Sequence, residues 1–566
     1  MGRRVTVLMM IMVSLGVSAA GERSDPAPYR SGRSVVMARH GMVATSHPLA
    51  VQIGLDVLKR GGNAVDAAVA TSAAMGLLEP MSCGIGGDLY ALVWDAKTGK
   101  LYGLNASGRA PYAATREYFL QRGMKQIPTT GPLSWSVPGC VDGWAQLLER
   151  FGSKSLKELL EPSIRYAEEG VPVPEVIAGY WRAAEKTLSR HPGTARTYLP
   201  QGRAPRPGEV FRNPYLARTY RLLAEQGRDA FYRGRIAAEI VAFSRSAGGL
   251  FSMKDFQEHT STWVDPVATT YRGYEIYELP PPGQGISVLQ MLNILEGYDL
   301  ARWGFHAPDY WHVLIETKKL VYADRARYYA DPQFAQVPVS QLISKDYADR
   351  RRRSIRMDRC LEEVAPGQFA DSSDTIYLCV VDEQRNCVSL IQSNYFGFGS
   401  GLVPGELGFV LQNRGALFAL DEHHPNRLEP GKRPFHTIIP AMALKQGKPW
   451  LVFGVMGGDM QPQGQVQVLV NLIDFGMNVQ QAGEAPRIEH RGSATPTGLP
   501  PEPKGGTVLA ERGLPEAIVA ELRRRGHRVV HTGTNGGGYQ AILIDQATGV
   551  LHGASEPRKD GCAAGY

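Results

Sequence analysis

The stretch that decides the fold is 374–382, which reads Asp-Thr-Ile-Tyr-Leu-Cys-Val-Val-Asp. A polar stop and a threonine precede a run dense in aromatic and β-branched residues, a composition typical of a buried β-strand. The turn-forming residues 383–386 follow, and a second strand pattern occupies 387–392. The pattern predicts a hairpin whose first strand begins at Thr375.

The position of Thr375 at the head of this strand has a chemical meaning. If the bond before Thr375 is cut, the threonine becomes a chain terminus. Its own α-amine can then take the proton of its hydroxyl, which is one way to activate a weak hydroxyl nucleophile. This arrangement indicates a self-cleaving amidohydrolase, cut between Asp374 and Thr375. The alternative is an ordinary structural threonine, since threonine is common in strands.

The composition is that of a globular protein with a weak net charge. The 566 residues are 43% hydrophobic, with a mean hydropathy of −0.21, and the formal net charge is +7. The basic run 350–353 lacks the interleaved aromatic residues of a nucleic-acid surface, so we expect a solvated helix face and no nucleic-acid partner. Strand and helix patterns alternate along the chain, which favours one large mixed domain.

The first twenty residues resemble a secretory signal. Arg3 and Arg4 form a basic region, 5–17 is apolar, and 18–21 is Ser-Ala-Ala-Gly, a small-residue cleavage site. The apolar run is short for a membrane span, and an uncleaved anchor is the alternative. We expect residues 1–20 to be removed and the protein to be exported, to a periplasm or to the exterior.

The cysteines and histidines do not form a metal-site pattern. Six cysteines are too few for a disulfide framework in a chain of this length, and no CxxC or His/Cys cluster has zinc spacing. His423 and His424 precede Pro425, which favours a turn over a metal site. We predict neither a metal nor an organic cofactor.

Local patterns predict further elements before the hairpin. Helices are expected over 49–60 and 64–75, a hairpin over 89–104, and largely helical structure over 155–256. The weakest pattern is 356–373, where the self-cleavage loop is expected.

Several motifs occur in the order found in one family. They are Gly-Gly-Asn-Ala-Val-Asp-Ala-Ala at 61–68, Tyr-Arg-Gly-Tyr at 271–274, Pro-Pro-Pro at 280–282, the strand from Thr375, Lys-Arg-Pro at 432–434, Gly-Gly at 457–458 and Gly-Ala-Ser-Glu-Pro-Arg at 553–558. From about residue 39 to 566 the chain resembles the γ-glutamyltranspeptidases (glutathione hydrolases) of the N-terminal-nucleophile hydrolase class.

This resemblance implies a fold and a maturation. The fold class is α+β, a four-layer αββα sandwich of two mainly antiparallel sheets between helix layers. One precursor is cut into a large subunit, 21–374, and a small catalytic subunit, 375–566, which together form one αββα domain. A homo-oligomer of the processed heterodimer stays open.

The resemblance also assigns roles to residues. Thr375 performs the self-cleavage at the carbonyl of Asp374 and later attacks the substrate amide. Gly457 and Gly458 supply the backbone N–H groups that hold the tetrahedral oxyanion, a role favoured by glycine because no side chain blocks a close approach. Asn394 matches an active-site asparagine.

Departures from the family pattern concern the substrate. The arginine that pairs with the glutamyl α-carboxylate falls at Ser107. Arg109 would face the same side of a strand and is a candidate replacement, the alternative being a structural arginine. The family's serine pair falls at His436 and Thr437. Thr437 keeps a hydroxyl, and His436 either binds substrate or is a core histidine.

The partner of the substrate's α-amine is altered as well. In the family this acidic residue sits in a lid, which corresponds here to the short stretch 413–432. Asp459, beside the oxyanion glycines, is a candidate replacement. A shortened lid predicts a more open site.

Three functions follow from these residues. The leading hypothesis is a γ-glutamyl hydrolase or transferase acting on glutathione-like γ-glutamyl amides, with water or an amine or peptide as acceptor. Because the α-amine and α-carboxylate contacts are altered, an acylase of the same fold stays open, acting on a glutaryl, poly-γ-glutamate or oxamate type of amide. The third is a non-catalytic binding relative, against which Thr375 and the glycine pair argue.

Overall fold

Two seven-stranded sheets lie face to face at the centre of the molecule. The computed structural model describes residues 29–364, 374–533 and 537–566, so the expected signal peptide and residues 365–373 of the expected cleavage loop lie outside the described residues. The first sheet has the order β19 (Cys562–Gly565), β2 (Met42–Thr45), β10 (Asp374–Val381), β11 (Cys387–Tyr395), β3 (Asp88–Asp95), β4 (Lys100–Ala106) and β7 (Thr262–Val264). The second has the order β1 (Val36–Ala38), β18 (Leu551–Ser555), β17 (Tyr539–Ile544), β13 (Lys448–Val455), β12 (Ala441–Lys445), β9 (Tyr274–Glu278) and β8 (Val267–Tyr271).

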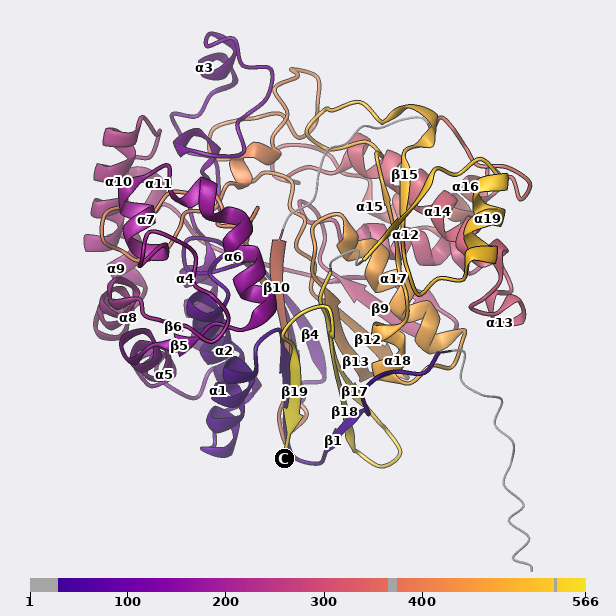
Figure 1. Ribbon diagram of the computed structural model, residues 1–566, viewed down its shortest axis with the longest axis horizontal. Coiled ribbons are helices and arrows are strands. Elements are labelled where there is room, and N and C mark those ends of the chain that lie inside the picture. The colour runs from indigo at the N-terminus through magenta and orange to yellow at the C-terminus, as the bar shows by residue number, and fades with distance from the viewer. Residues whose placement is uncertain (1–28, 365–373, 534–536) are drawn as a thin grey trace, which may run out of the picture.

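Helices cover the outer face of each sheet (Figure 1). Over the first sheet lie α1 (Pro48–Lys59), α2 (Ala64–Leu78), α4 (Cys140–Phe151), α5 (Leu156–Glu169) and α8 (Pro214–Gln226). Over the second lie α12 (Ile286–Leu295), α14 (Pro308–Tyr328), α17 (Met460–Ile473) and α18 (Val479–Glu484). Buried apolar side chains fill the space between each helix layer and its sheet, and a separate cluster fills the space between the sheets. These layers confirm the predicted αββα sandwich.

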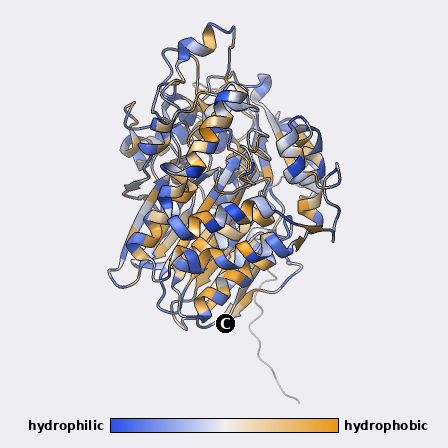
Figure 2. Ribbon diagram, turned by 90° about the vertical axis from the view of Figure 1, so that its left-hand side faces the viewer, coloured by the Kyte–Doolittle hydropathy of each residue, from blue (hydrophilic) through white to orange (hydrophobic). Residues whose placement is uncertain are grey.

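The hydropathy of the chain follows the layers. In Figure 2 the orange, apolar residues concentrate on the strands, while the helices alternate between orange and blue. Residues 376–381 of β10 are all buried, because a helix layer covers one face of this strand and the second sheet covers the other. Burial of both faces explains why residues 376–381 form an unbroken apolar run.

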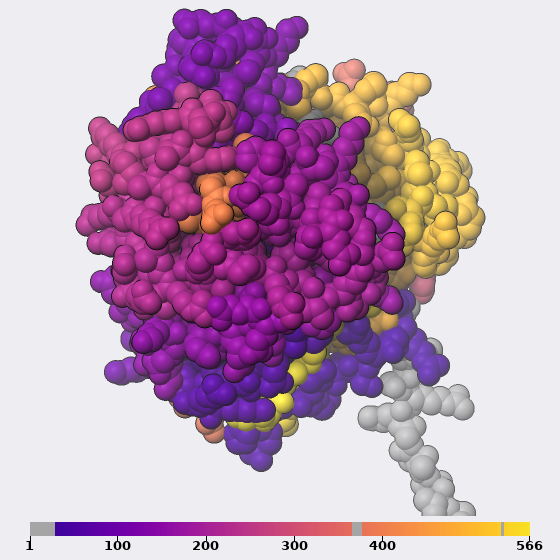
Figure 3. All heavy atoms as spheres, turned by 60° about the vertical axis from the view of Figure 1, so that its left-hand side comes forward, coloured from indigo at the N-terminus to yellow at the C-terminus, as the bar shows by residue number. Residues whose placement is uncertain are grey.

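The remaining elements complete the helix layers and a side lobe. The other helices of the described ranges are α3 (Arg116–Leu120), α6 (Glu175–Leu188), α7 (Pro192–Tyr198), α9 (Arg228–Tyr232), α10 (Arg235–Ala247), α11 (Met253–Gln257), α13 (Leu300–Trp303), α15 (Val339–Leu342), α16 (Lys345–Arg352) and α19 (Glu516–Arg524), with 3-10 turns η1 (Pro132–Ser134), η2 (Arg414–Leu417) and η3 (Pro503–Gly505). A small sheet of β14 (Ile488–Arg491), β15 (Thr507–Glu511) and β16 (Val529–Thr532) forms the lobe with α19, coloured yellow at the right of Figure 3, and β5 (Val171–Pro172) pairs with β6 (Val210–Phe211).

Several local predictions are confirmed. The two N-terminal helices occur as α1 and α2, and Asn63 closes a capping box at the start of α2 with Asp66. Strands β3 and β4 form the predicted hairpin, β10 and β11 form the hairpin after Thr375, and 155–256 is largely helical. No helix within the described ranges combines the length and the apolar character needed to cross a membrane.

Strand β10 lies in the middle of the first sheet. It pairs with β2 on one side, where Cys379 meets Ala44, and with β11 on the other, where Cys379 meets Ser389. Each of the two large sheets contains strands that precede position 374 in the chain and strands that follow it. The residues on either side of the predicted cut therefore share one core.

Candidate active site

The head of β10 is irregular where the sequence predicts the cut. Asp374 pairs with Tyr395 of β11, and Ile376 pairs with Gln392, so the register shifts across Thr375. Tyr395 has a φ of 81°, in the left-handed region that residues with a side chain rarely adopt. Bulges and strained residues of this kind concentrate near functional sites. The side chains of Asp374 and Thr375 lie outside the described part of the chain.

Gly457 and Gly458 form the turn between β13 and helix α17. Both have positive φ, 113° and 55°. Their carbonyl groups accept hydrogen bonds from the N–H groups of Met460 (2.9 Å) and Gln461 (3.1 Å), whereas neither glycine N–H donates to another group of the described chain. These two N–H groups lie at the N-terminus of α17, where the helix dipole favours negative charge. The turn can therefore stabilise an oxyanion.

Gln284 joins this turn to the segment that carries Thr437. Its Nε2 donates to the carbonyl of Thr437 (2.7 Å) and to the carbonyl of Gly458 (2.9 Å). Its Oε1 accepts a hydrogen bond from Arg325. The side chain is fully buried, so the distance between the two backbone segments is set by one side chain.

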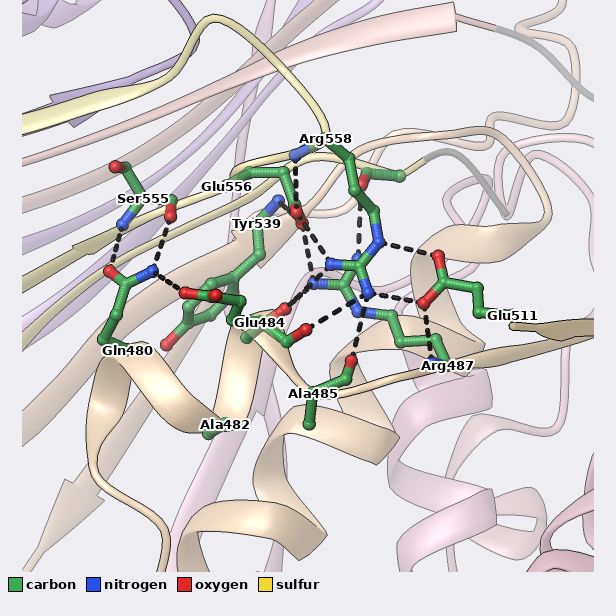
Figure 4. Close-up of polar contacts among 12 residues, drawn as sticks. Gln480, Ala482, Glu484, Ala485, Arg487, Glu511, Tyr539, Ser555, Glu556 and Arg558 are labelled. Atoms are coloured by element: carbon green, nitrogen blue, oxygen red, sulfur yellow. Dashed lines mark hydrogen bonds and ion pairs between the residues drawn. The ribbon is translucent and has the colours of Figure 1, made fainter. Parts of the chain in front are cut away.

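Arginines and glutamates near α18 form a buried cluster (Figure 4). Every nitrogen of the Arg558 guanidinium donates a hydrogen bond. Nε reaches Glu511 (2.7 Å), Nη1 reaches Glu556 (2.8 Å) and Nη2 reaches the carbonyl of Ala485 (3.1 Å). Arg487 donates from Nη2 to the other oxygen of Glu556 (2.7 Å). We call Arg487, Glu511, Glu556 and Arg558 the Arg558 centre.

The Arg558 centre positions the backbone against which the glycine turn packs. Arg487 Nη1 donates to the carbonyl of Gly537 (3.2 Å). The next residue, Gly538, accepts the N–H of Met456 (3.0 Å). A Cβ on Gly457 would lie only 3.0 Å from the Cα of Gly537, so the two glycine segments are in close contact and glycine is required there.

Asn394 lies in β11 beside the head of β10. Its side chain is 1% exposed, and its Nδ2 donates to the carbonyl of Pro80 (3.3 Å). Its Oδ1 has no hydrogen-bond partner in the described ranges. Leaving a buried acceptor without a donor costs free energy, so Asn394 Oδ1 can accept a hydrogen bond from a group that enters the site.

Asp88, at the start of β3, contacts most members of a second buried polar centre. Its Oδ1 accepts hydrogen bonds from the N–H groups of Gly108 (2.9 Å) and Gly139 (3.2 Å) and from Nε2 of Gln412 (2.9 Å). Its Oδ2 lies 2.8 Å from Nε2 of His436 and 3.7 Å from Nε of Arg414. We call Asp88, His436, Arg414 and Thr437 the Arg414 centre.

His436 and Thr437 both belong to this centre. His436 is fully buried, stacks on Tyr90 with 5.5 Å between ring centroids, and places Nδ1 2.7 Å from the carbonyl oxygen of Pro434. This geometry fits the core-histidine alternative. Thr437 is 3% exposed, and its Oγ1 accepts a hydrogen bond from Arg414 Nη1 (3.3 Å).

Arg109 does not lie in a strand, so the alternation argument for it is wrong. Strand β4 ends at Ala106, because the chain leaves the sheet at Gly108, where a Cβ would lie 1.5 Å from a neighbouring carbonyl oxygen. The Arg109 guanidinium donates to the carbonyl of Thr260 (3.1 Å) and to the side chain of Gln333 (3.4 Å). Arg109 as a carboxylate partner stays a prediction.

Asp459 follows the glycine pair and is engaged in an ion pair. Its Oδ1 lies 3.0 Å from Nη1 of Arg325, and its side chain is 21% exposed. An α-ammonium group of a substrate would have to share this carboxylate with a guanidinium. The structure thus gives Asp459 a partner inside the protein.

The short stretch 413–432 packs onto the segment around α3. Phe418, Leu420 and Leu428 share an apolar cluster with Ala110 and Phe119. The N–H of His424 bonds to the carbonyl of Asp421 (3.3 Å) in the turn that the sequence predicts before Pro425. Across the described residues, no group of three or more His, Cys, Asp or Glu side chains could hold a metal ion.

With the fold and this geometry established, the chain can be compared with known proteins. A family model described as Gamma-glutamyltranspeptidase matches residues 50–566. The chain belongs to the γ-glutamyltranspeptidase family. It is therefore an enzyme of the N-terminal-nucleophile hydrolase class, as its motifs indicate and its sandwich fold supports.

Relatives within the family are named for different activities. The Glutathione hydrolase-like YwrD proenzyme of Bacillus subtilis (strain 168) is 39% identical over 93% of this chain and 98% of its own length. The Acylase ACY 1 proenzyme of Pseudomonas sp. (strain SE83) is 36% identical over 92% of each. The crystal structure of cephalosporin acylase from Bacillus halodurans superposes with a TM-score of 0.88 and 44% identity, covering 96% of this chain and 99% of that chain.

The motifs in the sequence do not single out two residues of the candidate site, Gln284 and Arg414. Gln284 is hidden in the proline- and glycine-rich loop before α12. Arg414 is an isolated charge within the otherwise uncharged run 409–420. A single charge in such a run is a signal of a buried, functional arginine, since unpaired charges are rarely buried.

Proposed function

We propose that this family member is a self-processing hydrolase or transferase with Thr375 as its nucleophile, acting on amides whose acyl group carries a carboxylate. After loss of residues 1–20 on export, the cut would give subunits 21–374 and 375–566. The observation that carries the proposal is the place of Thr375, the second residue of the buried central strand β10. The sheet of β10 packs against the strand that leads to Gly457 and Gly458, whose N–H groups donate to no other group of the described residues.

The proposed maturation uses the same threonine as the reaction. The hydroxyl of Thr375 attacks the carbonyl carbon of Asp374. As the ester forms, the peptide C–N bond breaks and the hydroxyl proton passes to the nitrogen, which becomes the α-amine of Thr375. Water then opens the ester, which frees the carboxyl group of Asp374 and restores the hydroxyl of Thr375. The uncut chain has no α-amine at this position, so cleavage creates the general base.

The proposed reaction then proceeds through an acyl-enzyme. The α-amine of Thr375 takes the hydroxyl proton, and the oxygen attacks the amide carbon of the substrate. The N–H groups of Gly457 and Gly458 stabilise the negative oxygen of the tetrahedral intermediate. The proton passes to the leaving amine as the C–N bond breaks, and water or an acceptor amine releases the acyl group.

The first candidate substrates are glutathione-like γ-glutamyl amides. The membership in the family and the glutathione hydrolase-like relative support this choice. A second candidate is an acylase activity on another carboxyl-bearing amide, of the glutaryl, poly-γ-glutamate or oxamate type. It is favoured by the ion pair of Asp459 with Arg325, which occupies the candidate partner of an α-ammonium group, and by the acylase relatives.

Intact mass and N-terminal sequencing of the purified exported protein test the proposal. We expect two chains, the larger starting at residue 21 and the smaller at Thr375, and hydrolysis of γ-glutamyl p-nitroanilide. The Thr375→Ala variant should remain one chain and lack activity, whereas Thr375→Ser, which keeps a hydroxyl, should still be cut. A wild-type protein that stays uncut, or a Thr375→Ala variant that is cut and active, would refute the threonine mechanism and favour a binding-only relative.

A further inference from the structure

Arg414 is a buried cation whose hydrogen-bonding capacity is only partly used. It begins the 3-10 turn η2, and its side chain is 0% exposed. Nη1 donates to Thr437 Oγ1 (3.3 Å), while Nε and Nη2 have no hydrogen-bond partner in the described chain. Burial lowers the pKa of Arg414, although Asp88 opposes this shift, and a guanidinium remains protonated at neutral pH. A charge held in this way is costly unless an anion completes it.

Asp88 does not neutralise Arg414 by a direct hydrogen bond. The nearest approach is 3.7 Å, from Arg414 Nε to Asp88 Oδ2, which is attraction without a hydrogen bond. The carboxylate of Asp88 already accepts three hydrogen bonds at Oδ1 and one contact from His436 at Oδ2. Its acceptor positions are therefore used by other groups.

His436 adds no anion to the Arg414 centre. Its ring nitrogens lie 2.7 Å from the carbonyl oxygen of Pro434 and 2.8 Å from Oδ2 of Asp88. Burial lowers the pKa of His436, although the hydrogen bond with Asp88 opposes this shift. Asp88 is therefore the carboxylate of this centre, and it makes no hydrogen bond to Arg414.

Arg414 lies beside the predicted reacting centre. The guanidinium carbon is 5.3 Å from the ring centroid of Tyr395, and Tyr395 pairs directly with Asp374 at the head of β10. On the other side, Thr437 connects Arg414 through Gln284 to the carbonyl of Gly458. The Nε and Nη2 donors of Arg414, which have no partner among the described residues, thus lie between the start of the predicted small subunit and the Gly457–Gly458 turn.

We propose that Arg414 recognises the carboxylate of the substrate's acyl group, and that the enzyme accepts monoamides of dicarboxylic acids whether or not an α-ammonium group accompanies that carboxylate. This inference rests on the proposed function. Nη2, together with a neighbouring N–H of the same guanidinium, presents the paired donors that match the two oxygens of a carboxylate. A bound carboxylate would also give the buried guanidinium the hydrogen-bonded anion that Asp88 does not provide.

Within the described residues, the carboxylates that contact the site residues already have partners, so they offer little basis for selecting an α-ammonium group. Among the carboxylates that contact the site residues, Asp88 is engaged as described, and Asp459 is paired with Arg325 at 3.0 Å. The turn that begins at Arg414 ends at Leu417, which is apolar and buried. A glutaryl group and a γ-glutamyl group should therefore be taken with similar efficiency.

A purely structural arginine would look different. Arg433, also buried, donates to the carbonyl of Ser107 (3.1 Å), to the carbonyl of Thr260 (3.0 Å) and to Thr262 Oγ1 (3.0 Å). These contacts fix three backbone or side-chain oxygens and leave little for a ligand. Within the described ranges, Arg414 instead makes one hydrogen bond, to the hydroxyl group of Thr437.

Three p-nitroanilides test the inference: glutaryl, γ-glutamyl and valeryl, the last having a methyl group where glutaryl has its carboxylate. For the wild-type enzyme we expect kcat/KM for the glutaryl anilide to exceed that for the valeryl anilide at least about 100-fold. The γ-glutamyl value should lie within about tenfold of the glutaryl value. In Arg414→Gln the glutaryl-to-valeryl ratio should fall to near one, mainly through KM for the glutaryl anilide, while Arg414→Lys should keep part of the preference because its charge lacks the paired donors.

Arg109→Ala is the matched comparison, since Arg109 is the other candidate for the carboxylate. If Arg109→Ala abolishes the preference and Arg414→Lys and Arg414→Gln keep it, the inference is overturned. Should Arg414→Gln fail to fold, inhibition of the wild-type enzyme decides: glutarate should inhibit at least about tenfold better than valerate, and equal inhibition overturns the inference. An uncut, inactive wild-type chain retires the proposed function as well, whereas a cut enzyme that hydrolyses all three anilides equally retires only this inference.

Discussion

The two buried arginine centres contain the same kinds of groups but use them differently. In the Arg558 centre every guanidinium nitrogen of Arg558 donates, to Glu511, to Glu556 and to backbone carbonyls. In the Arg414 centre the guanidinium makes one hydrogen bond, and the carboxylate of Asp88 is taken up by other donors. When all guanidinium donors have protein partners, as in the Arg558 centre, the cluster holds the backbone in place. When donors lack partners, as in the Arg414 centre, they are available to bind a ligand.

The pKa values of the two arginines express the same contrast. Burial lowers the pKa of Arg558, but Glu556 and Glu511 outweigh it and raise the pKa above its ordinary value. Burial also lowers the pKa of Arg414, and there the more distant Asp88 does not compensate. The pKa values of Arg558 and Arg414 shift in opposite directions because Arg558 has more carboxylate partners and they are closer. A bound substrate carboxylate would add such a partner only to the Arg414 centre.

The largest expected effect is on stability, from Arg558→Met. This change leaves Glu556 and Glu511 without one of their buried partners, and breaking a buried pair costs about 3–5 kcal/mol. We expect the free energy of unfolding, measured by urea denaturation, to fall by about this amount. Arg203→Met, which breaks a partly exposed pair with Glu209, is the control and should change the stability much less. Equal effects of the two changes would contradict the comparison.

An intermediate effect is expected on the pH dependence of stability. Burial raises the pKa of Glu556, but Arg487 and Arg558 outweigh it, so its folded-state pKa lies below the ordinary value of 4.5. Its contribution is therefore complete above about pH 4.5 and is lost as the pH falls through the lower, folded-state pKa. We expect the free energy of unfolding of Glu556→Gln to decrease less steeply below pH 4.5 than that of the wild type. Parallel curves would show that Glu556 is not held ionised.

The smallest expected effect is on the stability of Arg414→Leu. Removing a buried cation that makes no hydrogen bond to a carboxylate should lower the free energy of unfolding by no more than about 1 kcal/mol, since one hydrogen bond, to Thr437, is lost. Asp88 keeps its four other contacts. The same urea titration measures the change, and a loss as large as that of Arg558→Met would make Arg414 a structural residue.

The elements of this fold that depend on local patterns could be predicted from the sequence. The capping box at Asn63, the hairpin after Thr375 and the all-round burial of α2 each depend on neighbouring residues. The pairing of β10 with β2 joins segments more than three hundred residues apart, and no local pattern encodes it. The layered sandwich was therefore predictable only through the family resemblance.

The residues of the candidate site also separate into those that local sequence patterns predict and those that they do not. The glycine pair and Thr375 stand out because a turn and a strand head are local features. The prediction for Arg109 depends on its alternation with Ser107, which applies only within a strand, and β4 ends at Ala106, before both residues. The residues around Arg414, namely Asp88, Tyr395 and Thr437, come from three separate segments of the chain. Only the folded structure therefore shows which of its N–H donors lack a partner within the described residues.

The central place of β10 would couple the proposed cut to folding. Strands from both sides of residue 374 share both sheets, so either half alone would expose unpaired strand edges. Thr375, the proposed nucleophile, lies near the head of β10, between the flanking strands β2 and β11. If the cut requires this arrangement, the fraction of molecules that are cut would measure the fraction that have folded.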